Sequence, residues 1–443
     1  MLIIILLYAT INCYKSNYKV YFFFVDKYST ECFVCQIILP RNRAARIETF
    51  CNRIILECMT LGVAPQDRRL LAIIYFAFFT SGMTSTLIGA MLPDIKDEHS
   101  LSYILVGALT TFHQIGNVAA VLIAGFLPYI IGRKKSSCAL GSGIFMGLAL
   151  MTLTGSPALL LAAFALTGVG RGTMSNIGNV VVSDVTANKG AGLNLLHATF
   201  AVGAMTSPFI AIACTRLASW RMAAWIVAAC NAGAVLCLAR SSLSDVPPRK
   251  EKAFAVGAVP FYKSASFWLN TAIMFFYLCG EAAICGWLVT YFKETGLMGM
   301  SFAQSTQSWL WIMVMAGRLL CASLSGKVSR NRLIFLLALA MTACFVLMIC
   351  TDSIALVIIG ILGLGLSMSG IYPSTLGTMD KAYTSDTAAM GVCMSAATVG
   401  GIIMPVTVGI VAECWGIASG ISTIAVALGA MLLLTVVKLA RRM

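Results

Sequence analysis

The sequence predicts an all-α membrane protein whose twelve transmembrane helices form two pseudo-symmetric bundles of six. Three observations support this fold class. Of 443 residues, 59% are hydrophobic and 11% are charged, whereas soluble proteins carry about 25% charged residues. From residue 70 onward, apolar stretches near the ~20 residues that span a bilayer alternate with short polar turns. One cation-rich turn occurs twice, with Arg133 and Arg330 197 positions apart, which indicates an internal duplication.

Residues 1–69 do not follow the spanning pattern. They contain two short apolar runs, 2–7 and 20–25, and no basic region precedes the first run as it would in a signal peptide. We expect an N-terminal extension outside the core fold. It is either a cytoplasmic arm or a segment upstream of the true start, for which Met59 is an alternative.

The chain has 16 cysteines, and most of them stand alone inside apolar segments. Cysteine behaves there as a small hydrophobic residue, so we expect free thiols. One group resembles a zinc site imperfectly because no histidine is near it: Cys32, Cys35, Cys51 and Cys58. The sequence therefore predicts neither a metal nor a cofactor.

The twelve expected spans divide into six and six around a polar interval. They are 70–92, 101–127, 137–154, 157–183, 192–215, 220–239, 266–291, 302–325, 333–351, 354–378, 387–412 and 415–438. We expect an N-terminal bundle at 70–240, a cytoplasmic linker at 241–265 and a C-terminal bundle at 266–443.

The distribution of Lys and Arg predicts the orientation, because cytoplasmic loops of membrane proteins are enriched in both residues. With the linker inside the cell, most loop cations fall on its side. The opposite side keeps only Lys96, Arg216, Arg221 and Lys293. We expect a multi-pass plasma-membrane protein with both core termini in the cytoplasm. The formal net charge of +14 then reflects membrane loops and not a nucleic-acid surface.

The repeated turn runs from Gly125 to Lys135. Gly125 and Gly132 permit close approach and tight turning. Three cations follow at the expected cytoplasmic surface, where we place them in water and among anionic headgroups: Arg133, Lys134 and Lys135. We interpret this turn and Arg330 as elements of topology and conformational switching. The duplication extends to Gly203 and Gly400, and to Asp184 and Asp380 ahead of Pro208 and Pro405.

This turn, its repeat and the six-plus-six layout resemble the major facilitator superfamily over residues 70–439. Three runs, 195–204, 277–287 and 370–374, are similar to its branch of fucose and hexose permeases. The resemblance implies alternating access and a proton-coupled sugar. Two features depart from it: the family's loop acid and following arginine fall on Tyr129 and Ile130, and span 70–92 has no acid.

Ionisable side chains inside spans are candidate functional residues, since a charge at a helix centre costs about 2.5–3.5 kcal/mol on insertion scales. Arg171, Glu281 and Arg318 lie in such positions. Asn179 shares a helix face with Arg171, and Tyr277 shares one with Glu281. A purely structural role, pairing with an acid or capping carbonyls, is the alternative for the arginines.

Further candidates are polar or aromatic. His113, Gln114 and Asn117 form a polar patch on one helix, which suits either a cavity or interhelical bonding. Tyr277 and Tyr372 are the expected cavity aromatics. The remaining aromatic candidates are assigned mainly to the membrane interface: Trp287, Tyr291, Trp309 and Trp311.

These features predict a secondary transporter, not an enzyme, that carries a small polar solute by alternating access. The expected solute is a sugar or a sugar acid. The spans contain two arginines and one glutamate, and this excess of positive charge favours the anionic sugar acid. Glu281 is the expected coupling residue, with a proton gradient as the energy source. Two alternatives remain: efflux of drugs or metabolites, favoured by an apolar, Met-rich cavity, and a non-transporting solute sensor. The expected partners are the solute and the bilayer, without nucleic acid, for a monomer.

Overall fold

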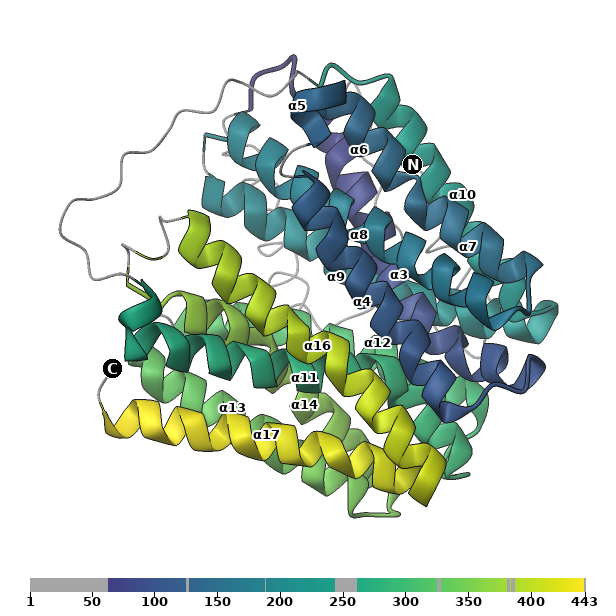
Figure 1. The fold of residues 1–443 in the computed structure, drawn as a ribbon, viewed down its shortest axis with the longest axis vertical. Coiled ribbons are helices and arrows are strands. Elements are labelled where there is room, and N and C mark those ends of the chain that lie inside the picture. Colours follow the sequence, from purple (N-terminus) through teal and green to yellow (C-terminus); the bar gives the residue numbers. More distant parts are fainter. Residues whose placement is uncertain are drawn as a thin grey trace, which may run out of the picture.

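The structure, a computed structural model, describes residues 63–124, 127–187, 189–243, 261–324, 328–380, 383 and 387–441. Most of the N-terminal extension with its five cysteines, Gly125, and most of the linker lie outside these residues. The described chain forms two helical bundles, coloured purple to teal and green to yellow in Figure 1.

The first bundle contains five long helices, one helix built from two consecutive segments, and a short connecting helix. Their bounds are α3 Arg68–Glu98, α4 Tyr103–Ala124, α5 Leu127–Ile131, α6 Arg133–Gly141, α7 Gly143–Leu153, α8 Pro157–Val185, α9 Lys189–Leu217 and α10 Trp220–Ala239. Here α6 and α7 together make the third spanning helix.

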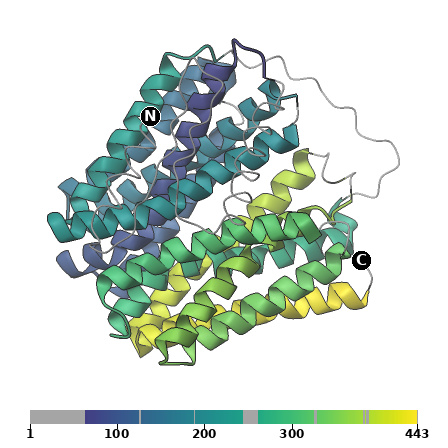
Figure 2. The same ribbon diagram turned by 180° about the vertical axis from the view of Figure 1, so that it is seen from behind.

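The second bundle follows a 3-10 turn at Phe261–Lys263. Its six helices are α11 Ala265–Glu294, α12 Met300–Leu324, α13 Arg330–Ile349, α14 Ile354–Leu376, α16 Thr387–Trp415 and α17 Ile417–Ala440. The view from behind in Figure 2 shows the same two bundles. The expected all-α fold of two six-helix bundles is confirmed.

Ten helices of the described chain are long and apolar enough to cross a membrane, and α4 and α12 complete the twelve. Apolar side chains on the outer surface suit lipid contact, for example Val426, 75% exposed, and Leu433, 64% exposed. So many exposed large apolar side chains are expected of a surface that contacts lipid.

Two helix bounds differ from the expected spans in a way that changes the interpretation. The first helix continues six residues past 92 to Glu98, although Pro93 lies within it. The third begins at Arg133, so the loop cations form the first turn of α6 and not a loop. Gly132 precedes them with φ +89°, a left-handed conformation that favours glycine.

Glycines bring helix backbones into contact in both bundles. A Cβ added to Gly203 of α9 would lie 2.1 Å from the carbonyl oxygen of Phe79 in α3. A Cβ on Gly400 of α16 would lie 2.3 Å from the carbonyl oxygen of Phe275 in α11. Because Gly203 and Gly400 are 197 positions apart, the two bundles repeat one helix contact, as the sequence duplication predicts.

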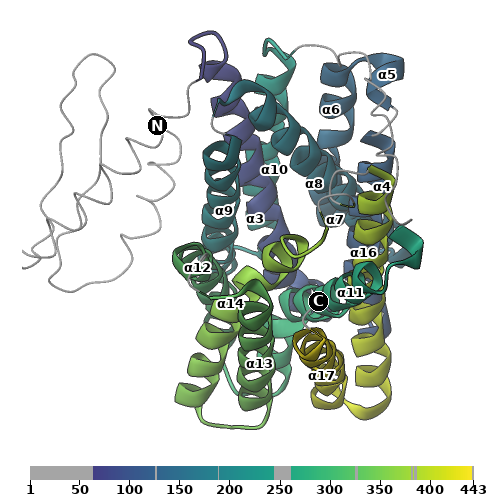
Figure 3. The ribbon, with the colours of Figure 1, turned by 90° about the vertical axis from the view of Figure 1, so that its left-hand side faces the viewer.

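The bundles face each other mainly through three helix pairs. They are α3 with α11, α4 with α16, and α9 with α12. Figure 3 shows α9 beside α12 and α4 beside α16. This arrangement surrounds the centre of the molecule with helices from both bundles.

Candidate functional site

The two bundles are joined at the end where α3 stops at Glu98 and α11 stops at Glu294, which we call the closed end. Between this end and the helix centres, side-chain hydrogen bonds cross from one bundle to the other. They are Gln304 Nε2 to Ala90 O (3.0 Å), Ser308 Oγ to Met205 O (2.9 Å) and Thr111 Oγ1 to Ile402 O (2.6 Å).

Backbones also touch across the interface. A Cβ on Gly107 of α4 would lie 2.5 Å from Pro405 O, and one on Gly409 of α16 would lie 2.4 Å from Tyr103 O. Such contacts leave no space for water or solute between α4 and α16 near the closed end.

A cavity of about 110 Å³ lies near the middle of the helices, between the bundles. Helices α3, α4 and α8 of the first bundle and α11, α12 and α16 of the second supply its walls. Its lining is Ser85, Ile88, Gly89, Thr110, His113, Gln114, Arg171, Leu278, Glu281, Ala282, Cys285, Gly286, Trp311 and Pro405.

Two hydrogen-bond donors in this lining are buried without a partner among the described residues. They are Nε of Arg171, from the first bundle, and Nε1 of Trp311, from the second. The ring of Phe200 is near both: its centroid is 5.7 Å from the Arg171 guanidinium carbon and 5.6 Å from the Trp311 ring centroid. A buried donor without an acceptor costs about 1–3 kcal/mol, so both donors favour a bound acceptor.

Glu281 is the acidic residue of the cavity lining. It comes from α11 in the second bundle and is partly buried. Both Arg171 of the first bundle and Arg318 of its own bundle lie within electrostatic reach of its carboxylate. The cavity therefore places opposite charges from the two bundles near each other.

His113 enters the cavity from α4 with a defined hydrogen-bond geometry. Its Nδ1 lies 2.9 Å from Thr167 Oγ1, and that hydroxyl donates to Phe164 O at 2.7 Å. Because the hydroxyl has one proton, it accepts from His113, which places a ring proton on Nδ1. In the neutral ring, Nε2 then carries a lone pair suited to a hydroxyl donor.

Four of the candidate residues line the cavity, namely Arg171, Glu281, His113 and Gln114. Tyr277 and Tyr372 lie behind Glu281, with ring centroids 6.3 Å apart. The Tyr277 hydroxyl donates to Met368 O at 3.0 Å, and the Tyr372 hydroxyl lies 2.7 Å from Met394 Sδ. Both phenols support the cavity wall and are not part of its lining.

The other expected residues also lie outside the lining. Asn117 is packed between α4 and α8, since a Cβ on Gly172 would lie 2.8 Å from its Oδ1. Asn179 is partly buried and Arg318 is exposed. Both lie farther along their helices, away from the closed end.

Trp311 is the main cavity residue that sequence reasoning placed elsewhere, at the membrane interface. It is buried, 7% exposed, and lines the cavity. Trp287 is buried as well, and its Nε1 donates to Pro405 O at 3.1 Å. The helical spacing of Gln304, Gln307 and Trp311 marks a polar stripe on α12 that predicts an inward face.

The repeated cations lie at the opposite end of the molecule. Arg133 does not face water as expected: its side chain is 8% exposed and its Nη1 lies 3.3 Å from Asp184 Oδ2, at the end of α8. Lys134 is partly buried, and Lys135 is exposed. In the second bundle, Arg330 donates to the carbonyl of Gly377, just after α14. Each arginine thus binds the end of a neighbouring helix.

Comparison with curated proteins found distant relatives. The chain is 23% identical to a protein TsgA homolog of Erwinia tasmaniensis over 333 residues, covering 72% of this chain and 82% of that protein. It is 28% identical to the sodium-dependent glucose transporter 1 of Rattus norvegicus over 141 residues, covering 30% of this chain and 28% of that protein.

Solved structures share the architecture. A bacterial homolog of the human lysosomal transporter Spinster, in an inward-facing and occupied conformation, superposes with a TM-score of 0.70 at 13% identity, over 85% of this chain and 97% of that chain. A point mutant of the nucleoside transporter NupG gives a TM-score of 0.68 at 13% identity, over 84% of this chain and 99% of that chain.

The profile of the Major Facilitator Superfamily matches residues 74–405, which is most of the two bundles. Together with the apolar spanning helices and the duplicated six-helix arrangement, this match shows that the chain is a multi-pass membrane protein belonging to the Major Facilitator Superfamily.

Proposed function

We propose that the chain is a secondary transporter that carries a small polar solute by alternating access, with the central cavity as the solute site. The observation that carries this proposal is the pair of unpartnered donors, Arg171 Nε and Trp311 Nε1, which enter one cavity from different bundles. A solute that accepts from both donors contacts both bundles. Its binding therefore depends on how the bundles are placed, as alternating access requires.

The polar lining suits a solute with several hydroxyl groups, such as a sugar or a sugar acid. Glu281 accepts hydrogen bonds from hydroxyl groups, while Arg171 and Trp311 donate hydrogen bonds to oxygens. Arg171 and Arg318 carry two positive charges near the cavity, and Glu281 carries one negative charge. The net positive charge favours a carboxylate on the solute. The name of one distant relative, a glucose transporter, is consistent with a carbohydrate.

We place the closed end outside the cell. The opposite end carries the repeated cations Arg133, Lys134 and Arg330, as cytoplasmic surfaces do. In this orientation the core helices begin and end in the cytoplasm, and the structure corresponds to a conformation sealed from the outside. The membrane is the plasma membrane.

We assign coupling to Glu281 and the driving ion to the proton. The ionised carboxylate of Glu281 attracts Arg171 across the interface, and the protonated carboxyl group attracts it less. Protonation therefore changes how firmly the bundles are held together around the cavity. The transport experiment with imposed pH or sodium gradients distinguishes the proton from sodium as the driving ion.

A thermal-shift screen of the purified protein tests the proposed solute class. The probes are glucose, fucose, gluconate and glucuronate, because a ligand that binds the folded state raises the melting temperature by mass action. We expect a shift with the acids that exceeds the shift with the neutral sugars.

The variant Arg171→Met assigns any shift to the cavity. Loss of the shift in this variant supports the site. A shift of unchanged size would place binding elsewhere, and the absence of a shift with all four probes in the native chain would reject the carbohydrate class. Uptake of the same probes into proteoliposomes, with imposed pH or sodium gradients, then tests transport and its driving ion.

A further inference from the structure

The ends of the first helices of the two bundles carry matching charged pairs. Helix α3 finishes with Lys96 and Asp97 before Glu98, and α11 finishes with Lys293 and Glu294. Lys96 and Lys293 are 197 positions apart, as are Asp97 and Glu294, which is the period of the internal duplication. The duplication thus placed a basic and an acidic residue at equivalent positions of both bundles.

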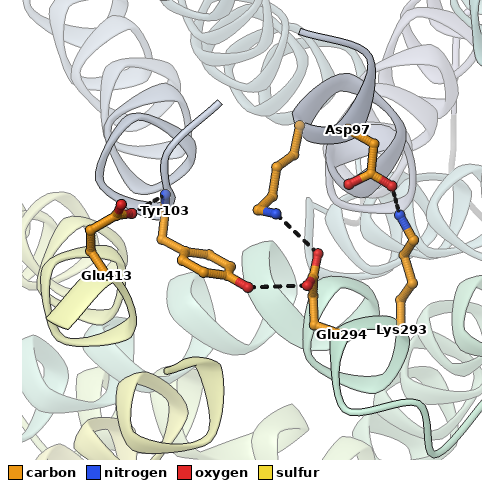
Figure 4. Close-up of polar contacts among 6 residues, drawn as sticks. Asp97, Tyr103, Lys293, Glu294 and Glu413 are labelled. Carbon is orange, nitrogen blue, oxygen red and sulfur yellow. Dashed lines mark hydrogen bonds and ion pairs between the residues drawn. The ribbon is translucent and has the colours of Figure 1, made fainter. Parts of the chain in front are cut away.

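These four residues form two reciprocal ion pairs across the interface, shown in Figure 4. Lys96 Nζ lies 3.1 Å from Glu294 Oε1, and Lys293 is ion-paired with Asp97. Each bundle therefore gives its lysine to the acid of the other. Such reciprocity is the mark of a two-fold contact in which each side uses the same surface.

The Lys96–Glu294 pair is the more protected of the two. Its side chains are 16% and 21% exposed, whereas Asp97 is 52% exposed. The hydroxyl of Tyr103 donates to Glu294 Oε2 at 3.1 Å, and Lys96 Nζ lies 4.5 Å above the Tyr103 ring. Burial and these added contacts reduce screening by salt.

A second repeat-related set lies at the same end of the molecule. Glu413, at the end of α16, accepts from the backbone N–H of Tyr103 at 2.6 Å, where α4 begins. Arg216, at the end of α9, donates to Ser301 Oγ at 3.3 Å, near the start of α12. Arg216 and Glu413 are again 197 positions apart, so every polar contact in this group joins one bundle to the other.

We propose that Lys96, Asp97, Lys293 and Glu294 form a two-fold gate that holds the closed end shut. A path from the cavity to this end between α3 and α11 requires these helices to separate, since Gly89 of α3 packs against the carbonyl of Cys285 beneath the gate. Separation breaks both ion pairs together. Because ion pairs near the surface are weak, the gate biases the balance between closed and open forms without locking it.

Charge exchange that leaves net charge unchanged tests the gate. The first variant combines Lys96→Glu with Asp97→Lys, and the second combines Lys293→Glu with Glu294→Lys. Each variant places like charges opposite each other at both contacts. The third variant carries all four changes and restores opposite charges at both contacts. The three variants differ from the native chain only in where the charges stand.

The native Cys285 serves as reporter, because it lines the cavity below the gate. A membrane-impermeant methanethiosulfonate is applied to right-side-out and to inverted vesicles, and the labelling rate of the Cys285 peptide is read by mass spectrometry. The variant Cys285→Ser identifies the signal among the other thiols. The assay needs no solute, so it remains informative if the proposed solute class is wrong.

We expect each two-residue variant to label Cys285 faster from the closed end, by about 2-fold to 30-fold, from the worth of two ion pairs near the surface. The four-residue variant should return near the native rate. Elution as a single symmetric peak in size-exclusion chromatography shows that each variant is folded. Unchanged labelling in both two-residue variants, or no return toward the native rate in the four-residue variant, would overturn the proposal.

Discussion

The indole of Trp311 in α12 lies edge-on to the ring of Phe200 in α9, with ring centroids 5.6 Å apart and an interplanar angle of 62°. This contact joins the second bundle to the first beside the cavity. It also leaves the indole N–H buried without a protein acceptor among the described residues. One side chain therefore combines contact between the bundles with an open donor for a solute.

Trp311→Phe should weaken solute binding without disturbing the fold. Phenylalanine retains a ring for the contact with Phe200 but removes the N–H, so affinity should fall by about 2-fold to 10-fold, the worth of one hydrogen bond. Titration by thermal shift measures it. Trp309→Phe, on the same helix but outside the cavity lining, is the matched control and should bind as the native chain does.

Glu281→Gln should separate coupling from transport. The amide keeps the shape of the acid and, like its protonated form, both donates and accepts hydrogen bonds, but it cannot release or take up a proton. We expect solute exchange between the two sides of proteoliposomes to persist, while accumulation driven by a pH gradient is lost. Native-like accumulation in this variant would remove Glu281 from the coupling role.

Gly203→Ala should destabilise the first bundle. The added Cβ would lie 2.1 Å from Phe79 O and must push α9 away from α3, an overpacking effect that typically costs about 1–3 kcal/mol. The melting temperature of the purified protein should fall by several degrees. Gly233→Ala in α10 is the control, because nothing lies within 4 Å of its Cβ. It should be neutral or slightly stabilising through helix propensity.

Lys438 provides a test of a buried cation. Its side chain is 1% exposed, and its Nζ donates to Asn270 Oδ1 at 2.6 Å and to Thr378 Oγ1 at 2.5 Å. Removing an acceptor leaves the buried ammonium group without a partner. This lowers the stability of the fold more than removing the charged group itself does. Asn270→Leu should therefore lower the melting temperature more than Lys438→Met does.

Two further variants complete this test. The double variant Asn270→Leu with Lys438→Met should recover part of the loss, because no buried charge remains. Arg441→Met, at an exposed position three residues after Lys438, controls for the loss of a cation near the end of α17. A double variant less stable than Asn270→Leu alone would argue against a stranded charge.

The sequence predicted the bundles well because lipid requires long apolar helices, and that requirement is visible in composition and spacing. The expected spans and the observed helices agree closely from α8 to α10. Their duplication was also visible in Gly203 and Gly400, since only glycine allows the backbone contact that both bundles use.

The site was predicted only in part. Arg171 and Glu281 could be identified from the sequence, because a charged residue inside an apolar span is costly and is retained for a function. Trp311 was misplaced because an aromatic residue suits both a cavity and a membrane interface. Lys438, near the end of α17, is buried. Its acceptors, Asn270 in α11 and Thr378 just after α14, are distant in sequence. No local sequence pattern therefore predicts these two hydrogen bonds.

The reciprocal ion pairs at the closed end link positions that are far apart in the gene. Lys96 depends on Glu294 and Lys293 on Asp97, so a charge lost in one bundle is best compensated by a substitution in the other. Among descendants of the duplicated ancestor, these positions should covary as swapped charges. Neither half of the gene is then free to diverge at its helix ends without a matching change in its sister half.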